Sequence, residues 1–161
     1  MNHSGHPFWD FSLQLYAQPG VADASLALQD RFDADVNVLF FVLWAGENRR
    51  ALTVADIGEL IASVAPWRDG VIRPLRTARR FLKTTSWKST ETDHLRKNIL
   101  TEELHAERFQ QIFLEARLDQ FAVSAAGSRE DCVTQNLQNY AAAINATFSE
   151  EQVSVLISGL G

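Results

Sequence analysis

The sequence contains few of the residues that cross-link chains or interrupt helices. Its 161 residues include one cysteine, four prolines and eight glycines. The single cysteine, Cys132, cannot form an intramolecular disulfide, which favours a reducing, cytoplasmic setting. Apolar residues recur mostly at spacings of three and four, which is the period of an α-helix, and they rarely alternate. We therefore predict an all-α protein.

No apolar run is long enough to cross a membrane. The longest, VLFFVLWAG at residues 38–46, is about half of the ~20 residues that a spanning helix needs. The chain begins MNHSGHPFWDFSL, which lacks the positive start and the apolar core of a secretory signal. Apolar residues make up 46% and charged residues 22%, as in ordinary globular domains. We expect one compact cytoplasmic domain over residues 1–161, with disorder in residues 1–7.

The spacing predicts seven or eight helices around one buried central helix. Residues 36–45 form this central helix, because they are apolar at every position except Asn37, and a helix that is apolar all round is buried all round. An aspartate, Asp33 or Asp35, begins the helix. The amide of Asn37 then needs a partner, either a free carbonyl or a side chain such as Asp10 or Gln29.

The other helices are expected over residues 8–16, 21–32, 52–64, 74–84, 93–123, 128–148 and 149–160. Pro66 closes the helix that begins near residue 52. Two helix starts carry capping residues, at Ser128–Asp131 and Ser149–Gln152, and Thr53–Asp56 at a third start is close to a capping box. Residues 84–92, TTSWKSTET, are rich in serine and threonine, so we interpret them as a loop or hinge.

One segment concentrates positive charge. Seven of the fifteen Lys and Arg residues lie in residues 67–88 with one acid, Asp69, a local charge of +6 in a protein of net charge −5. On a helix, four cations share one face: Arg73, Arg76, Arg80 and Lys83. We predict that these four, with Trp67 beside them, bind an acidic protein or another anion. A pI near 5.3 disfavours a general nucleic-acid binder, although a local patch can bind RNA or DNA.

A polar line runs through the apolar face of the helix expected over residues 93–123. Its members follow heptad spacing: Arg96, Glu103, Gln110 and Arg117. A heptad step turns the face by only about 20°, so these residues stack, and each costs about 1–3 kcal/mol if it is buried without a partner. With Glu107, they form a buried polar network that pairs with Arg76 or Arg80. The alternative is a pocket wall or a seam for a partner helix. We expect Arg76 to be mainly structural and Arg73, Arg80 and Lys83 to be mainly exposed.

No motif predicts a catalytic residue, a metal site or a cofactor. Two Glu-x-x-His pairs, Glu91/His94 and Glu102/His105, have the spacing found in di-iron bundles. Both fall on one expected helix, about 16 Å apart, whereas a di-metal site needs facing helices. A partial calcium-loop pattern at Asp33 lacks the required glycine and final glutamate. There is no P-loop and no Gly-x-Ser-x-Gly.

Several stretches are distinctive in combination: FWDFSL at residues 8–13, DVN at 35–37, PWR at 66–68, RPLR at 73–76 and ELHAERFQ at 103–110. Together they resemble a small family of uncharacterised proteobacterial proteins, over roughly residues 8–120. The resemblance implies a bacterial cytoplasmic protein, and it assigns no activity and no catalytic or binding residue. The chain after Ala126 has no counterpart in it.

Two functions follow as expectations. The first is a non-enzymatic interaction or adaptor protein, which docks an acidic partner or a phosphate through the basic face. The alternative is a helical protein that binds a small anionic molecule between the basic helix and the polar line, with or without a reaction. The sequence makes no prediction about oligomeric state.

Overall fold

The computed structural model describes residues 5–161, which contain eight α-helices and no strand. This confirms the predicted all-α class. The helices are α1 (Pro7–Tyr16), α2 (Val21–Phe32), α3 (Val36–Glu47), α4 (Val54–Trp67), α5 (Arg73–Thr84), α6 (Thr90–Glu115), α7 (Arg129–Ala143) and α8 (Glu150–Ser158). A π-helix, Arg68–Ile72, joins α4 to α5, and a short 3-10 helix, Leu118–Gln120, follows α6.

The helices gather into two compact units. The first unit runs up to Ile61 and resumes at Gln111–Gly161, so it holds α1, α2, α3, α7, α8 and the start of α4. The second unit, Ala62–Gln110, holds the end of α4, the π-helix, α5 and most of α6. In the described part of the chain, no helix has both the length and the hydropathy that crossing a membrane requires.

The central helix of the first unit is α3, as predicted. Its residues 38–46 are all buried. The carboxylate of Asp35 caps its start, where it accepts hydrogen bonds from the backbone N–H groups of Asn37 at 2.9 Å and Val38 at 3.2 Å. The partner of the Asn37 amide is neither Asp10 nor Gln29. The side chain of Gln111 donates to Asn37 Oδ1 at 2.9 Å.

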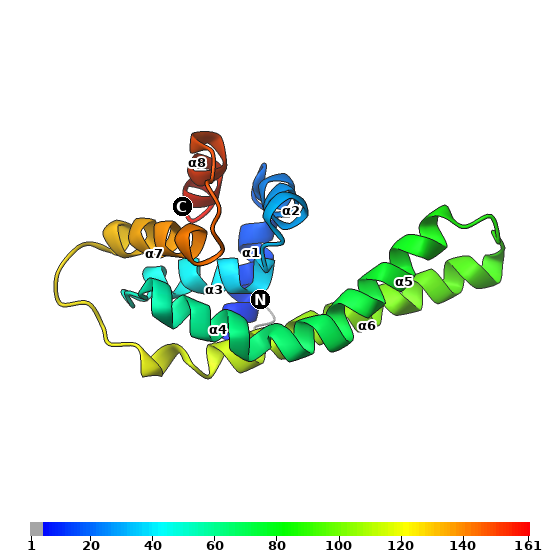
Figure 1. The fold of residues 1–161 in the computed structure, drawn as a ribbon, viewed down its shortest axis with the longest axis horizontal. Helices are drawn as coiled ribbons and strands as arrows, with labels where there is room; N and C mark the ends of the chain where they lie inside the picture. The colour runs from blue at the N-terminus through cyan, green and yellow to red at the C-terminus, as the bar shows by residue number, and fades with distance from the viewer. Residues whose placement is uncertain (1–4) are drawn as a thin grey trace. The chain divides into compact units, whose positions relative to one another are not determined.

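The helix that covers α3 most extensively is α7, which lies along it in Figure 1. Two side chains of α7 satisfy backbone groups in the segments just before and just after α3. The fully buried amide of Asn136 donates to the carbonyl of Arg50 at 2.8 Å and accepts from the N–H of Leu52 at 2.9 Å. The hydroxyl of Tyr140 donates to the carbonyl of Asp35 at 2.9 Å. These bonds pair polar groups that burial would otherwise penalise.

Pro66 does not end α4, contrary to expectation. The helix continues through Trp67 into the π-helix and α5, so the backbone is helical over residues 54–84. In the π-helix the N–H of Arg73 bonds to the carbonyl of Arg68, five residues back. The following residue, Pro74, has no N–H to donate. A wider turn accommodates a proline that a regular helix would reject.

Two other helices, α6 and α7, end at least five residues earlier than expected. The helix expected to reach residue 123 ends at Glu115. The guanidinium of Arg50 holds the chain that follows, through an ion pair with Asp119 at 3.0 Å and a hydrogen bond to the carbonyl of Phe121. The helix expected to reach residue 148 ends at Ala143, because Asn145 has a φ of 53°, a left-handed conformation that terminates helices.

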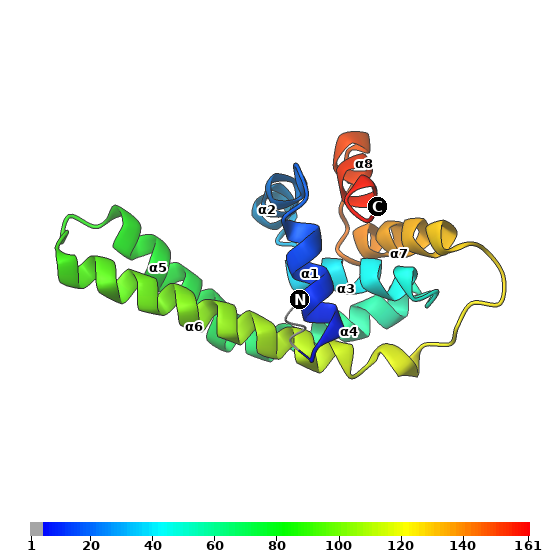
Figure 2. The ribbon, with the colours of Figure 1, turned by 180° about the vertical axis from the view of Figure 1, so that it is seen from behind.

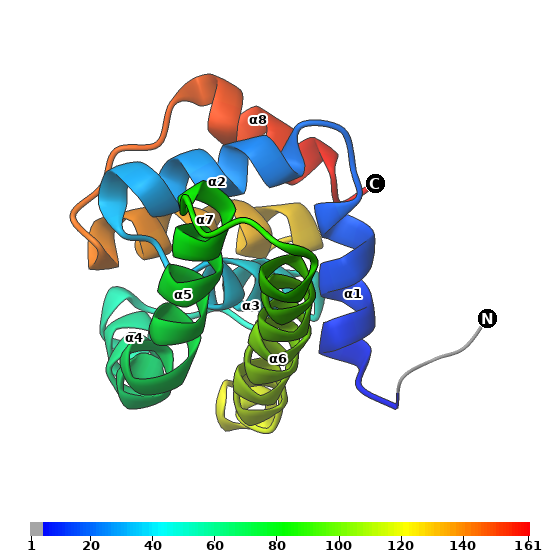
Figure 3. The same ribbon diagram turned by 90° about the vertical axis from the view of Figure 1, so that its right-hand side faces the viewer.

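The capping boxes at Ser128 and Ser149 form as predicted. The helix that follows the second, α8, lies alongside α2 in Figure 3. Of the stretch expected to be disordered, residues 1–4 lie outside the described residues, and Pro7 already belongs to α1.

At Gly46, α3 and α7 lie too close together for a side chain to fit between them. A Cβ atom at this position would lie 2.7 Å from the Cα of Val133 in α7. We predict that Gly46→Ala lowers the free energy of unfolding by about 1–3 kcal/mol, because the α7 backbone must move to admit the methyl group. Chemical denaturation of the full chain measures this.

The matched control is Gly58→Ala in α4, where an added Cβ meets nothing within 4 Å. This change should leave stability unchanged or raise it by up to about 1 kcal/mol, because alanine suits a helix better than glycine. Equal effects at the two glycines would show that α7 does not pack against Gly46.

Candidate functional site

The candidate site lies in the second unit, where α5 and α6 run side by side in opposite directions (Figures 1 and 2). Residues 85–89 connect the two helices and lie inside the stretch predicted as a loop or hinge. We call α5, this connection and α6 the hairpin. Buried and half-buried side chains recur along the pair at spacings of three and four: Ile72, Leu75, Arg79 and Leu82, then Arg96, Ile99, Glu103, Ala106 and Gln110. We call these residues the seam. Their spacing is that of a coiled coil.

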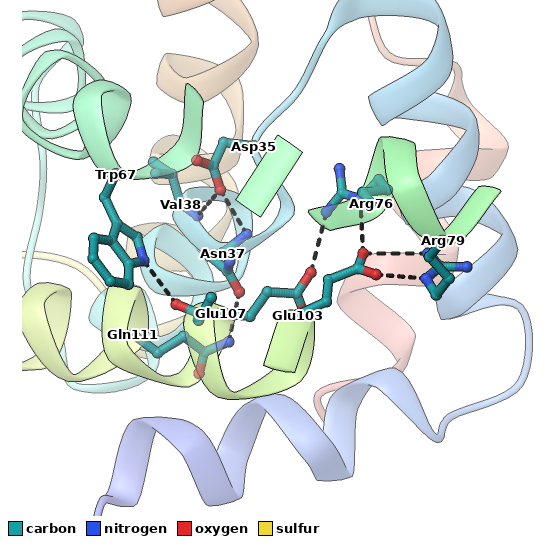
Figure 4. Close-up of polar contacts among 10 residues, drawn as sticks. Asp35, Asn37, Val38, Trp67, Arg76, Arg79, Glu103, Glu107 and Gln111 are labelled. Carbon is teal, nitrogen blue, oxygen red and sulfur yellow. Dashed lines mark hydrogen bonds and ion pairs between the residues drawn. The ribbon is translucent and has the colours of Figure 1, made fainter. Parts of the chain in front are cut away.

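A cluster of charges occupies the middle of the seam (Figure 4). The Glu103 side chain is buried, with 3% of its residue surface exposed. Its carboxylate accepts a hydrogen bond from Arg76 Nε at 3.1 Å and two from Arg79, one of them from Nη2 at 3.2 Å. Arg76 Nη2 also pairs with Glu107 Oε1 at 3.1 Å. We call Arg76, Arg79, Glu103 and Glu107 the Glu103 cluster.

The electrostatics of the Glu103 cluster favour its charged form. Burial raises the pKa of the Glu103 carboxyl, but the hydrogen bonds and charges of Arg79 and Arg76 outweigh this, so its pKa lies below the ordinary 4.5. The hydrogen bond to Glu103 raises the pKa of Arg79, against its partial burial. Glu103 and Arg79 are therefore ionised at neutral pH.

The four cations of the basic face differ in how exposed they are. Arg76 belongs to the Glu103 cluster, as the ion-pair interpretation expects. Arg73 Nε lies 3.2 Å from Asp69 Oδ1, one turn back along the helix. Arg80 and Lys83 are exposed. The second arginine on Glu103 is Arg79, whereas the sequence suggested Arg80 for that role.

Trp67 stands at the end of the hairpin away from the connection. Its indole Nε1 donates to the carbonyl of Ala106 at 2.9 Å, and its ring meets Phe109 edge-on, with 6.3 Å between ring centres. These contacts anchor α4 on α6. The ring is still partly exposed, so part of the surface predicted for a partner remains accessible at this end.

The polar line of α6 is shorter than expected. Arg96 and Gln110 lie on the seam, one heptad before and one heptad after Glu103. Arg117 follows the end of α6 and belongs to the first unit. There its guanidinium covers the ring of Phe113 and donates to the Phe113 carbonyl at 2.8 Å.

The sequence spacing could have predicted that Arg79 lies on the seam. Ile72, Leu75, Arg79 and Leu82 follow a 3-4-3 spacing, in which Arg79 takes a core position between apolar residues. A charged residue at such a position needs an opposite charge on the facing helix. Glu103 occupies the equivalent position on α6, between Ile99 and Ala106.

Charge separates sharply between the two units. The second unit, Ala62–Gln110, has ten Lys and Arg against six Asp and Glu, a net charge of +4. The remainder of the chain has five against fourteen, a net charge of −9. No group of three or more His, Cys, Asp or Glu in residues 5–161 is arranged to hold a metal ion. The basic hairpin is thus the chemically distinctive part of the described chain.

A family model described as protein of unknown function (DUF2390) matches residues 7–114. The chain belongs to this family. The match covers α1 to α5 and nearly all of α6, and so includes the whole Glu103 cluster, while α7 and α8 lie outside it. No curated protein and no solved structure matches the chain.

The Glu103 cluster predicts that substitutions of two adjacent glutamates, Glu102 and Glu103, change stability by very different amounts. Glu103→Gln removes the charge that both arginines share, and it should lower the free energy of opening the hairpin by about 1–3 kcal/mol. Glu102→Gln is the matched control, because Glu102 is exposed and its described ion pair is a 3.5 Å contact with His105. This control should change stability by no more than about 0.5 kcal/mol. Hydrogen exchange of the α5 amides measures both, and similar effects would contradict the assignment.

The same cluster predicts a dependence on pH. Because folding lowers the pKa of Glu103, its contribution to stability is complete above the ordinary value of 4.5 and is lost as the pH falls through the lowered folded value. The melting temperature of Glu103→Gln should therefore lie below that of the wild type by a constant margin at neutral pH. The margin should shrink as the pH falls below 4.5. A margin that grows in acid would contradict the stated direction.

Proposed function

We propose that the protein is a non-enzymatic interaction protein of the cytoplasm, and that its second unit docks an acidic protein through the exposed basic residues of α5. The observation that carries the proposal is the separation of charge. The second unit, Ala62–Gln110, carries a net charge of +4 in a chain whose remainder carries −9, so this unit attracts anionic surfaces. Complementary charge of this kind orients a partner and speeds its association.

The different positions of the cations on α5 support a role for this helix in binding a partner. Arg76 and Arg79 have their guanidinium groups on Glu103, so they stabilise the hairpin and hold its two helices in register. Arg80 and Lys83 of the same helix are exposed. Because they are exposed, these two cations can be reached by an acidic partner.

The rival proposal, a small anion held between the basic helix and α6, receives less support. Its best cation donors would be Arg76 and Arg79, but their Nε and Nη2 groups already donate to the carboxylates of Glu103 and Glu107. A foreign anion would have to displace a buried, charge-assisted pair, which costs several kcal/mol. A broad nucleic-acid surface is also disfavoured, because the overall charge is −5.

Charge reversal on α5 tests the proposal. We expect Arg80→Glu/Lys83→Glu to reduce capture of a partner from the protein's natural host by about tenfold or more, with an unchanged circular dichroism spectrum. Capture by the wild type should weaken as salt is raised, because exposed charges are screened.

Lys88→Glu is the control for the single variant Lys83→Glu, since it alters net charge equally but lies in the connection after α5. Quantitative mass spectrometry of the captured proteins measures all variants. If the double reversal retains its partners, or if Lys88→Glu loses them as fully as Lys83→Glu, the basic face of α5 is not the docking site.

A further inference from the structure

Two rows of side chains lie next to each other on one side of the hairpin. The basic row of α5, with spacings of three and four, contains Arg76, Arg80 and Lys83. A row with the same type of spacing on α6 contains Leu100, Leu104 and Glu107. The ion pair between Arg76 and Glu107 joins the two rows at one end. Both rows therefore face the same side.

The antiparallel course of the helices sets which residues are level with each other. Lys83 lies seven residues after Arg76, and Leu100 lies seven residues before Glu107. Seven residues rise by about 10 Å on either helix, so moving from the ion pair towards the connection brings Lys83 beside Leu100. By the same count, Arg80 is level with Leu104. The surface thus pairs each leucine with a cation.

Both leucines are accessible. Leu100 is 38% exposed and Leu104 is 46% exposed, and they are separated by one helical turn. A single exposed leucine needs no explanation, whereas two at this spacing with cations along one border form a patterned surface. Apolar residues spaced by one turn match the ridge of another helix, and the cations match carboxylates beside that ridge.

We propose that this surface, made of Arg80, Lys83, Leu100 and Leu104, binds an acidic amphipathic helix of the partner protein. The partner helix lies along the hairpin as a third helix, with its apolar residues on the two leucines and its carboxylates facing Arg80 and Lys83. The inference rests on the proposed function and narrows it to one class of partner. Nucleic acid fits this surface less well, because phosphates have no favourable contact with leucine side chains.

A designed peptide probes the surface directly. It has about 18 residues, or about five helical turns, with leucines at i and i+4 and glutamates beside them. A scrambled peptide of identical composition distributes the leucines around the helix. We expect the full-length protein to bind the patterned peptide about tenfold or more tightly than the scrambled one, as measured by fluorescence anisotropy. A labelled oligonucleotide tests the alternative of nucleic-acid binding in the same assay.

Leucine variants separate this inference from charge attraction alone. Leu100→Ser/Leu104→Ser should weaken binding of the patterned peptide by about tenfold or more. Leu95→Ser is the matched control, because Leu95 is 49% exposed on the same helix but lies outside the row that contains Leu100. Circular dichroism confirms that each variant stays helical.

The possible results distinguish the two proposals. If the leucine double variant binds the peptide as well as the wild type while Arg80→Glu/Lys83→Glu does not, the helical partner is wrong and the basic docking face stands. If the charge reversal has no effect on either the peptide or the captured partners, the proposed function itself fails. Equal binding of patterned and scrambled peptides, or tighter binding of the oligonucleotide, also overturns the inference.

Discussion

The buried carboxylate of Glu103 is the interaction on which the second unit depends. No residue of α5 is fully buried, so apolar contacts alone provide little stabilisation between α5 and α6. Glu103 instead draws Arg76 and Arg79 of α5 onto the seam. A charged pair at a core position also selects one register, because any slip along the helices would leave a charge unpaired. The Glu103 cluster therefore fixes how the two helices of the hairpin are aligned.

The first unit, in contrast, is organised around a buried apolar helix. Its central helix, α3, is buried over residues 38–46 and has no polar face of its own. It needs apolar cover on every side, and α7 provides a large part of that cover. The amide of Asn136 and the hydroxyl of Tyr140 then satisfy backbone groups just before and just after α3. The helix α7 lies beyond the residues that the family model matches, so in this chain a segment outside the match completes the core.

Most of the fold followed from the sequence where one local signal dominated. The apolar run at residues 38–46 predicted the buried helix, and the capping boxes at Ser128 and Ser149 predicted two helix starts. The errors arose where distant residues decide the outcome. Arg50 holds the chain that follows the helix end at Glu115, and the partner of the Asn37 side chain is Gln111. The prediction at Pro66 was wrong because α4 contains this proline and continues past it into the π-helix.

The sequence predicted the type of interaction at the candidate site, a buried glutamate paired with arginines, but not every residue that forms it. Periodicity placed Glu103 on a buried face and indicated an arginine of the basic helix as its partner. It could not choose between neighbouring arginines, because Arg79 and Arg80 differ by only one residue, and the choice depends on how α5 is rotated against α6. Which leucines remain exposed is likewise a property of the paired helices.

Hydrogen exchange of the full chain, alone and with its captured partner, tests the central claim most directly. The claim is that the partner docks on the hairpin and leaves the core of the first unit untouched. The account predicts new protection in α5 and in the part of α6 that contains Leu100 and Leu104, with no change in α3 and α7. Protection confined to helices of the first unit, with the exchange of α5 and α6 unaltered, would contradict it.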